Sequence, residues 1–161
     1  MHNSAVNSVC ILGLGYIGLP SAALLANRGY QVRGVDVVSE VVDTINAGHI
    51  HIVEPDLDTF VRAAVQSGRL RAYPDVRAAD AFIIAVPTPF RDGYEPDLSY
   101  LEAAAESIAP RVSPGNVIIV ESTCPVGTTE HIGNILTSHG VDTDSVDIAH
   151  CPERVLPGRI M

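Results

Sequence analysis

Short apolar runs alternate with amphipathic stretches along the whole chain. The apolar runs have strand length and predict strands over 8–12, 31–36, 70–73, 81–86, 117–120 and 146–149. The stretches between them have the apolar spacing of helices and predict helices over 18–28, 40–47, 57–66, 100–108 and 128–138. The run over 81–86 is apolar throughout, as expected of a parallel strand buried on both faces. The alternation predicts an α/β fold, with a doubly wound parallel sheet and helices on both faces.

Capping residues set the expected starts of two helices. Ser39 is the expected N-cap of the helix over 40–47, because its hydroxyl can accept a bond from a free N–H group of the first turn. Asp97 or Ser99 is the expected N-cap of the helix over 100–108, and the two alternatives stay open.

A glycine-rich turn joins the first strand to the first helix. Its sequence is Gly13-Leu-Gly-Tyr-Ile-Gly18, which matches the pattern G-x-G-x-x-G in the required context of strand, turn and helix. Gly13 would allow the sharp turn, Gly15 would let a pyrophosphate approach the backbone, and Gly18 would let the helix pack closely on the strand. The helix N-terminus would then hold the phosphates through its free N–H groups. A turn of this kind can also be purely structural.

An acidic residue ends the second strand at the spacing expected for dinucleotide binding. Asp36 follows Gly18 by 18 residues, 36 − 18, where a ribose-binding carboxylate is expected at about 20. A carboxylate accepts bonds from ribose hydroxyls and repels a 2′-phosphate, so NAD is favoured over NADP as the cofactor. The alternative is that Asp36 only begins a turn. Turn and acid together predict a Rossmann fold with strand order 3-2-1-4-5-6.

Composition and charge narrow the class of partner. The chain has 161 residues, 47% of them hydrophobic and 18% charged, without linkers or low-complexity tracts, so residues 1–161 are expected to form a single globular domain. The formal net charge of −9 argues against nucleic acid and against an anionic membrane surface as partners. The longest apolar runs have strand length, and no signal peptide is apparent. Three widely spaced cysteines suit a reducing compartment, so the expected location is the cytoplasm.

Two histidines suggest a metal site that the sequence does not support further. His49 and His51 have His-x-His spacing in a loop, but no third ligand is placed nearby. We therefore expect no metal.

Five segments, most of them in loops near the predicted strands, carry a resemblance to a known family: 13–20, 43–48, 54–57, 86–89 and 121–128. They resemble the nucleotide-sugar 6-dehydrogenases, which act on UDP-glucose, GDP-mannose or UDP-N-acetylmannosamine. The segments 51–56, 85–90 and 151–158 resemble most the UDP-N-acetyl-D-mannosamine dehydrogenase branch. The resemblance extends over nearly the whole chain.

The resemblance implies an activity and a set of site residues. The family oxidises a sugar CH2OH to a carboxylate with two NAD+, through a thiohemiacetal and a thioester on a cysteine. It implies cofactor contacts from Gly13, Gly15, Tyr16, Ile17, Gly18, Asp36, Val86, Pro87, Thr88 and Thr123. Thr123 and Glu153 would support catalysis by ordering water, and Arg154 and Val155 would contact the UDP-sugar substrate. Full-length members are expected to be homo-oligomers.

The chain also departs from the family. The family's catalytic cysteine and lysine lie in a substrate domain beyond this sequence, and neither Cys124 nor Cys151 occupies the position of the nucleophile. Many relatives carry a second glutamate four residues after the one that matches Glu153, where this chain has Pro157. We therefore expect the chain alone to bind NAD without oxidising a sugar. The alternatives are a stand-alone NAD-binding or sensing module, a UDP-glucose or GDP-mannose dehydrogenase, and another Rossmann oxidoreductase such as a hydroxyacid dehydrogenase.

Overall fold

All the predicted strands and helices are present in the computed structural model, which describes residues 6–93 and 95–154. The strands are β1 (Ser8–Leu12), β2 (Gln31–Val35), β3 (Leu70–Tyr73), β4 (Ala81–Ile84), β5 (Val117–Val120) and β6 (Asp147–His150). The helices are α1 (Gly18–Asn27), α2 (Ser39–Asn46), α3 (Leu57–Gln66), α4 (Ser99–Ile108) and α5 (Thr128–Ser138), with short 3-10 turns η1 (Ala109–Arg111) and η2 (Thr143–Ser145).

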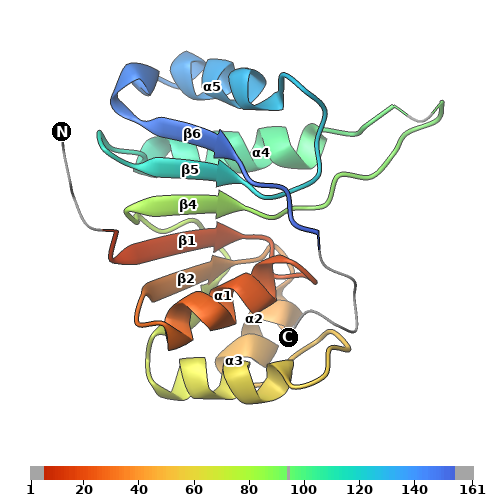
Figure 1. Ribbon diagram of the computed structural model, residues 1–161, viewed down its shortest axis with the longest axis vertical. Helices are drawn as coiled ribbons and strands as arrows, with labels where there is room; N and C mark the ends of the chain where they lie inside the picture. Colours follow the sequence, from red (N-terminus) through yellow and green to blue (C-terminus); the bar gives the residue numbers. More distant parts are fainter. Residues whose placement is uncertain (1–5, 94, 155–161) are drawn as a thin grey trace.

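The strands form one parallel sheet of six, in the order β3-β2-β1-β4-β5-β6 (Figure 1). The predicted Rossmann order is therefore confirmed. Leu12 at the end of β1 is level with Val35 of β2 on one side and with Ile84 of β4 on the other. The chain leaves β1 toward one edge and enters β4 toward the other, so the strand order reverses here. β6 lies one residue further along than predicted, since His150 still pairs with Val120.

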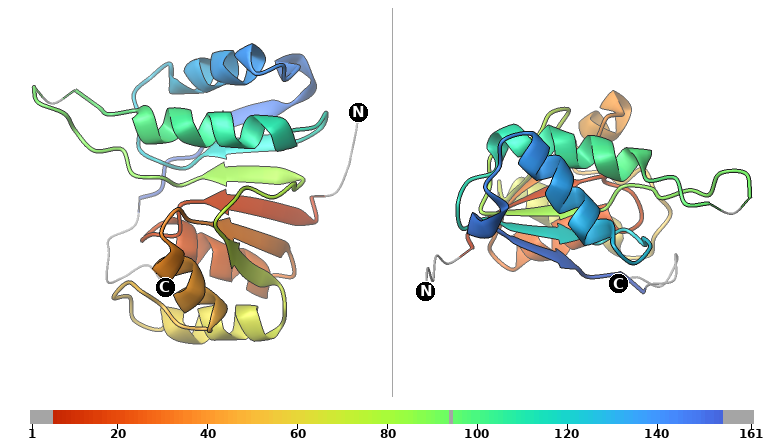
Figure 2. Two further views of the ribbon diagram at one scale, coloured as in Figure 1. Left: turned by 180° about the vertical axis from the view of Figure 1, so that it is seen from behind. Right: turned by 90° about the horizontal axis from the view of Figure 1, so that it is seen from above.

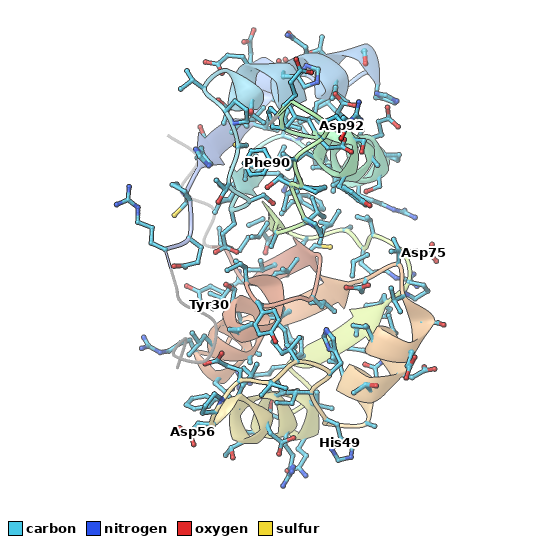
Figure 3. All side chains as sticks on the ribbon, turned by 90° about the vertical axis from the view of Figure 1, so that its right-hand side faces the viewer. Tyr30, His49, Asp56, Asp75, Phe90 and Asp92 are labelled. Carbon is cyan, nitrogen blue, oxygen red and sulfur yellow. The ribbon has the colours of Figure 1, made fainter. Side chains whose placement is uncertain are left out.

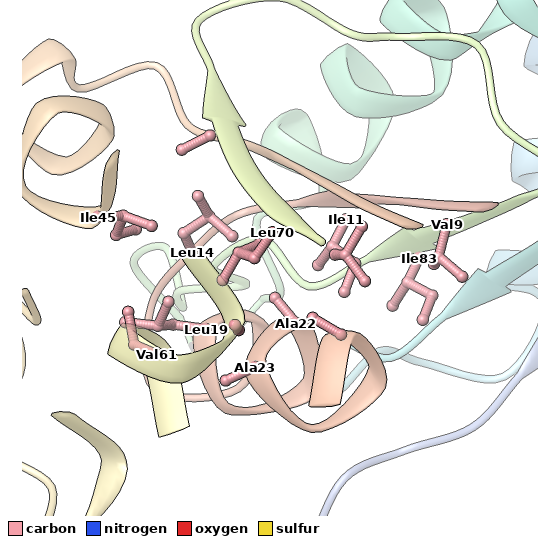
Figure 4. Packing of buried hydrophobic residues seen from close by; sticks show 14 of the residues in the cluster. Val9, Ile11, Leu14, Leu19, Ala22, Ala23, Ile45, Val61, Leu70 and Ile83 are labelled. Carbon is pink, nitrogen blue, oxygen red and sulfur yellow. The ribbon is translucent and has the colours of Figure 1, made fainter. Parts of the chain in front are cut away.

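Helices cover both faces of the sheet, with α1 on one face and α4 on the other (Figures 1 and 2). Alternate residues of β1 point into two separate cores. Ile11 packs in a cluster with residues of α1, α2 and α3, and the close-up shows other members of this cluster, such as Leu19 and Ala22 of α1 (Figure 4). Cys10 packs with residues of α4 and α5, such as Leu101. Cys10 is thus a buried core residue, as its place in an apolar strand indicates, and its burial raises the pKa of the thiol.

Two strands end earlier than predicted. β4 was expected to continue to residue 86 but ends at Ile84, where the carbonyl accepts bonds from the N–H groups of both Glu121 (2.9 Å) and Ser122 (3.2 Å). The ladder between β4 and β5 ends with this forked contact. β2 ends at Val35, and the carboxylate of the next residue, Asp36, accepts hydrogen bonds from the backbone N–H groups of Leu14 and Val38.

The N-caps of α2 and α4 both differ from the predicted ones. Val38 is the N-cap of α2 and Ser39 is the first helical residue, so Ser39 does not cap the helix. No side chain caps α2 among the described residues; Oδ1 of Asp36 accepts the N–H of the N-cap residue, Val38, at 3.0 Å and so shapes the turn before the helix. For α4 neither alternative holds, because the N-cap is Leu98 and Ser99 is the first helical residue. Oδ1 of Asp97 accepts the N–H of Ser99 at 3.0 Å from the position before the N-cap.

A long hairpin-like loop leaves β4 and projects beyond the carboxyl ends of the strands (Figure 1). It is closed by a bridge between Phe90 and Pro96 and by an ion pair between Arg91 and Asp97 at 2.7 Å. Within residues 6–93 and 95–154, we find no helix that is long and apolar enough to cross a bilayer.

Candidate functional site

The glycine turn after β1 is shaped by two very close backbone approaches. Gly13 has φ of +88°, and a Cβ added there would lie 2.6 Å from the carbonyl oxygen of Ala85 after β4. A Cβ at Gly18 would lie 1.8 Å from the carbonyl oxygen of Gly13. Gly18 thus allows α1 to fold back on its own turn, and Ala85 is its second neighbour at 3.4 Å. Neither position has room for any side chain.

Gly15 is different, because the space beside it is open. A Cβ added there meets nothing within 4 Å, and its φ lies outside the left-handed region. The protein therefore has no packing reason for glycine at this position, and the bare backbone faces the cleft. Next to it, α1 begins at Gly18 with Ile17 as its N-cap. Among the described residues no side chain caps the first turn, and that turn holds no acidic residue. The positive end of the helix dipole is thus available to a negatively charged group.

Asp36 lies at the end of β2, half-buried, beside the glycine turn. Its Oδ2 accepts the N–H of Leu14 at 3.0 Å, and its Oδ1 accepts the N–H of Val38 at 3.0 Å. These two bonds fix the carboxylate in position and leave lone pairs on both oxygens, since each carboxylate oxygen can accept two bonds. Asp36 therefore orders the turn and still presents acceptors to the cleft that it lines.

A cleft of about 1010 Å³ opens where β1, β2, β4 and β5 end. Figure 3 looks onto this edge of the sheet, where Asp75 follows β3 and Phe90 follows β4. Of the residues predicted from the sequence, the cleft is lined by Gly13, Gly15, Tyr16, Ile17, Asp36, Val86, Pro87, Thr88, Thr123 and Glu153. Segments more than one hundred residues apart in the chain thus contribute to a single site.

Some predicted residues lie elsewhere. Gly18 is buried beneath the turn and acts through packing. Arg154 is exposed and does not line the cleft, and Val155 lies outside the described residues. Cys124 and Cys151 do not line the cleft either. Sγ of Cys124 instead lies 3.5 Å from Nε2 of His150.

Sequence reasoning missed one wall of the cleft, which is formed by α4 and the turn after it. Tyr100, Ala104, Ser107 and Arg111 line the cleft from there. Their spacing of three to four residues marks one face of a helix, and this face combines small and polar side chains. The sequence signal that could have identified this wall is therefore a helix face that carries both small and polar side chains.

The two histidines of the loop after α2 differ in their position relative to the cleft. His51 lines the cleft, while His49 does not and is exposed. Partial burial lowers the pKa of His51, and the negative charge of Asp36 opposes this shift. Across the part of the chain that the structure describes, no three His, Cys, Asp or Glu residues are grouped closely enough to hold a metal ion.

Ser122 and Glu121 form the far end of the cleft, after β5. Ser122 is buried and donates its hydroxyl to the carbonyl of Val86 at 2.7 Å, so the loops after β4 and β5 are held together. Glu121 is half-buried and accepts the hydroxyl of Ser21 from α1, at 3.4 Å to Oε1 and 3.5 Å to Oε2. Burial raises the pKa of Glu121, and the negative charge of Glu153 raises it further, against the bond from Ser21.

Taken together, these residues fit a dinucleotide. The bare backbone at Gly15 and the uncapped N-terminus of α1 suit a pyrophosphate, and the fixed carboxylate of Asp36 suits a ribose. All three lie around the point where the strand order reverses. This fold and this site define a Rossmann-type dinucleotide-binding domain.

The comparisons with known proteins give the family. Residues 7–161 match the model of the UDP-glucose/GDP-mannose dehydrogenase family, NAD binding domain. The chain belongs to this family, and its cofactor is NAD. The family match contradicts the hydroxyacid dehydrogenase alternative.

Three similar proteins illustrate the match. The chain is 52% identical to an NDP-N-acetyl-D-galactosaminuronic acid dehydrogenase of Ralstonia nicotianae, over 96% of this chain and 38% of that protein. It is 51% identical to a UDP-N-acetyl-D-mannosamine dehydrogenase of Escherichia coli, over 96% of this chain and 39% of that protein. A solved UDP-N-acetyl-mannosamine dehydrogenase of Staphylococcus aureus superposes with a TM-score of 0.89 at 39% identity, over 95% of this chain and 38% of that chain. The chain thus spans about two fifths of the length of its relatives.

Proposed function

We propose that this chain is the NAD-binding domain of a nucleotide-sugar 6-dehydrogenase that oxidises UDP-N-acetyl-D-mannosamine to the corresponding uronate with two NAD+. The observation that carries the proposal is the cleft at the strand ends, with the bare backbone of Gly15 beside the fixed carboxylate of Asp36. Relatives that act on UDP-N-acetyl-mannosamine or are named for N-acetyl-galactosaminuronic acid, at 51% and 52% identity, support an N-acetylated sugar as the substrate class.

The proposed roles follow the cleft from one end to the other. Gly15, Tyr16 and Ile17 would hold the pyrophosphate through backbone N–H groups at the start of α1. Asp36 would accept the adenosine ribose hydroxyls. The residues proposed for the far end of the cofactor are Val86, Pro87, Thr88 and Thr123.

The chemical roles are divided between the cofactor and the chain. NAD supplies the hydride acceptor when it is bound. Thr123 and Glu153 would order water beside the reacting carbon, and Arg154 and Val155 would contact the sugar nucleotide. With Pro157 in place of a second glutamate, Glu153 would be the only carboxylate of this pair.

The first experiment tests activity with and without the rest of a longer chain. We expect the 161-residue chain to bind NAD+ but to produce no NADH from UDP-N-acetylmannosamine, because the thiol that traps an aldehyde and the base for the hydroxyl are expected in a further domain. The measurement is NADH absorbance for this chain and for the product of the open reading frame continued to its natural stop codon.

Turnover by the 161-residue chain above background would refute this division of labour. If the reading frame ends at Met161, the alternative of a stand-alone NAD-binding module is favoured instead. UDP-glucose, GDP-mannose and UDP-N-acetylgalactosamine are tested as alternative substrates. Faster turnover of one of them would contradict the assignment of UDP-N-acetylmannosamine as the substrate.

The second experiment tests the role of Asp36 in cofactor choice. We expect NAD+ to bind at least about a hundredfold more tightly than NADP+, since a like charge placed against the 2′-phosphate costs several kcal/mol. Asp36→Asn removes the charge and keeps one of the two acceptor oxygens, so it should narrow the ratio of NAD+ to NADP+ affinity about tenfold or more. Isothermal titration calorimetry measures both affinities.

Asp43→Asn is the matched control, because Asp43 is exposed on α2 outside the cleft and the substitution removes the same charge. It should leave the ratio unchanged. Equal binding of NADP+ and NAD+ by the unaltered chain would refute the assignment of Asp36.

A further inference from the structure

The far end of the cleft holds a carboxylate to which the proposed function gives no role. Glu121 follows β5 directly, is half-buried, and lines the cleft together with Thr123 and Glu153. The hydroxyl of Ser21, from the second turn of α1, donates its one proton in a long bond shared between the two carboxylate oxygens, at 3.4 and 3.5 Å. Glu121 is therefore held between the cofactor-binding helix and the end of β5.

The orientation of the cofactor brings one particular group to this carboxylate. Asp36 lies after β2, and the glycine turn lies after β1, so adenosine and pyrophosphate occupy that side of the reversal point. The nicotinamide then extends toward the ends of β4 and β5, where Glu121 lies. Its ring carries a positive charge in NAD+ and none in NADH.

The charges around Glu121 come from several elements. Glu153, after β6, is the charged group that acts on it directly, and like-charge repulsion between the two carboxylates raises the pKa of Glu121. His150 lies on β6, where it pairs with Val120, and contacts the carbonyl of Ser122 at 3.3 Å. The remaining charged or titratable side chains that line the cleft are Tyr16, Asp36, His51, Asp75, Arg77, Tyr100 and Arg111. A positive nicotinamide ring would relieve the repulsion between Glu121 and Glu153.

We propose that Glu121 is a specificity-determining residue for the oxidation state of the cofactor: when ionised it favours NAD+ over NADH, and protonation removes the preference. The inference rests on the proposed function through the placement of the cofactor in the cleft. It assigns Glu121 no part in bond breaking.

The direction of the pH dependence follows from the charge. Glu121 is neutral below its pKa and negative above it, so the affinity for NAD+ rises as pH increases through this pKa, and the affinity for NADH does not. The ratio of the two affinities should increase about threefold to tenfold, as expected for one partly solvated charge near another. By linkage, NAD+ binding favours the ionised form and releases a proton near this pKa.

The experiment is isothermal titration calorimetry of the 161-residue chain with NAD+, NADH and ADP-ribose, between about pH 5 and about pH 8. Each titration is run in two buffers of different ionisation enthalpy, which gives the number of protons released. We expect more protons to be released with NAD+ than with ADP-ribose, which lacks the nicotinamide and serves as the control for the other groups of the cleft. Glu121→Gln should make the ratio of NAD+ to NADH affinity independent of pH.

Two further variants make the test specific. Glu106→Gln removes a charge from the exposed surface of α4 outside the cleft and should behave as the unaltered chain does. Ser21→Ala removes the hydroxyl that stabilises the ionised carboxylate, so the rise in NAD+ affinity should move to higher pH. This variant tests the inference even if Glu121→Gln does not fold.

The outcomes separate the inference from the proposed function. If none of the three ligands binds, the proposed cofactor site fails. If all of them bind but the affinity ratio is the same at every pH, or changes identically in Glu121→Gln, Glu121 does not discriminate between the oxidation states.

Discussion

Gly15→Val is expected to lower the affinity for NAD+ by at least about a hundredfold, or about 3 kcal/mol, while the fold remains intact. The Cβ at this position enters open space that faces the cleft, with no protein atom within 4 Å of it. The branched side chain occupies the volume through which a pyrophosphate reaches the backbone and the start of α1. Calorimetry measures the affinity, and circular dichroism with thermal unfolding measures the fold.

Gly15→Ala provides a graded control, because one methyl group excludes less volume than an isopropyl group. Its loss of affinity should be smaller than that of Gly15→Val, with unchanged stability. Retained affinity in the valine variant would mean that the turn has only a structural role. A large loss of stability in either variant would contradict the open space that the structure shows beside Gly15.

Gly18→Ala is expected to destabilise the fold, in contrast to Gly15→Val, which should lower only the affinity for NAD+. The expected loss in the free energy of unfolding is about 3 kcal/mol or more. The added Cβ would lie 1.8 Å from the carbonyl oxygen of Gly13. Because this neighbour is backbone, relief requires α1 to move away from the turn, and α1 is anchored in the core through its own Leu19 and Ala22. Urea denaturation of the variant and of the unaltered chain gives the difference.

Gly133→Ala is the matched control within another helix, α5. There the Cβ would meet Cδ1 of Ile148 at 3.5 Å, which is an ordinary contact. Alanine is the better helix former, so this variant should gain about 0.5–1 kcal/mol. If Gly18→Ala proves as stable as Gly133→Ala, the claim that α1 approaches its own turn too closely for a side chain at Gly18 is wrong.

The sequence by itself determined the architecture, because periodicity is a local property. Apolar runs of strand length, as over 117–120, alternate with amphipathic stretches such as 57–66, and both were predicted with the bounds that the structure has. Once the elements alternate in this way, few topologies remain, and the glycine turn before α1 selects the Rossmann order. The cofactor class followed from Asp36 and the turn, since both signals lie within a few dozen residues of one another.

Only the tertiary structure decided how the cleft is completed, because its walls are joined by contacts between distant parts of the chain. Ser21 and Glu121 are separated by 100 residues, and no pattern in the sequence pairs them. Asp36 also accepts the N–H groups of Leu14 and Val38, and these two bonds depend on how β2 ends. The packing of α1 likewise shows that Gly18 is required by the carbonyl of Gly13 and Gly15 is not required by any protein atom, although both match the same pattern.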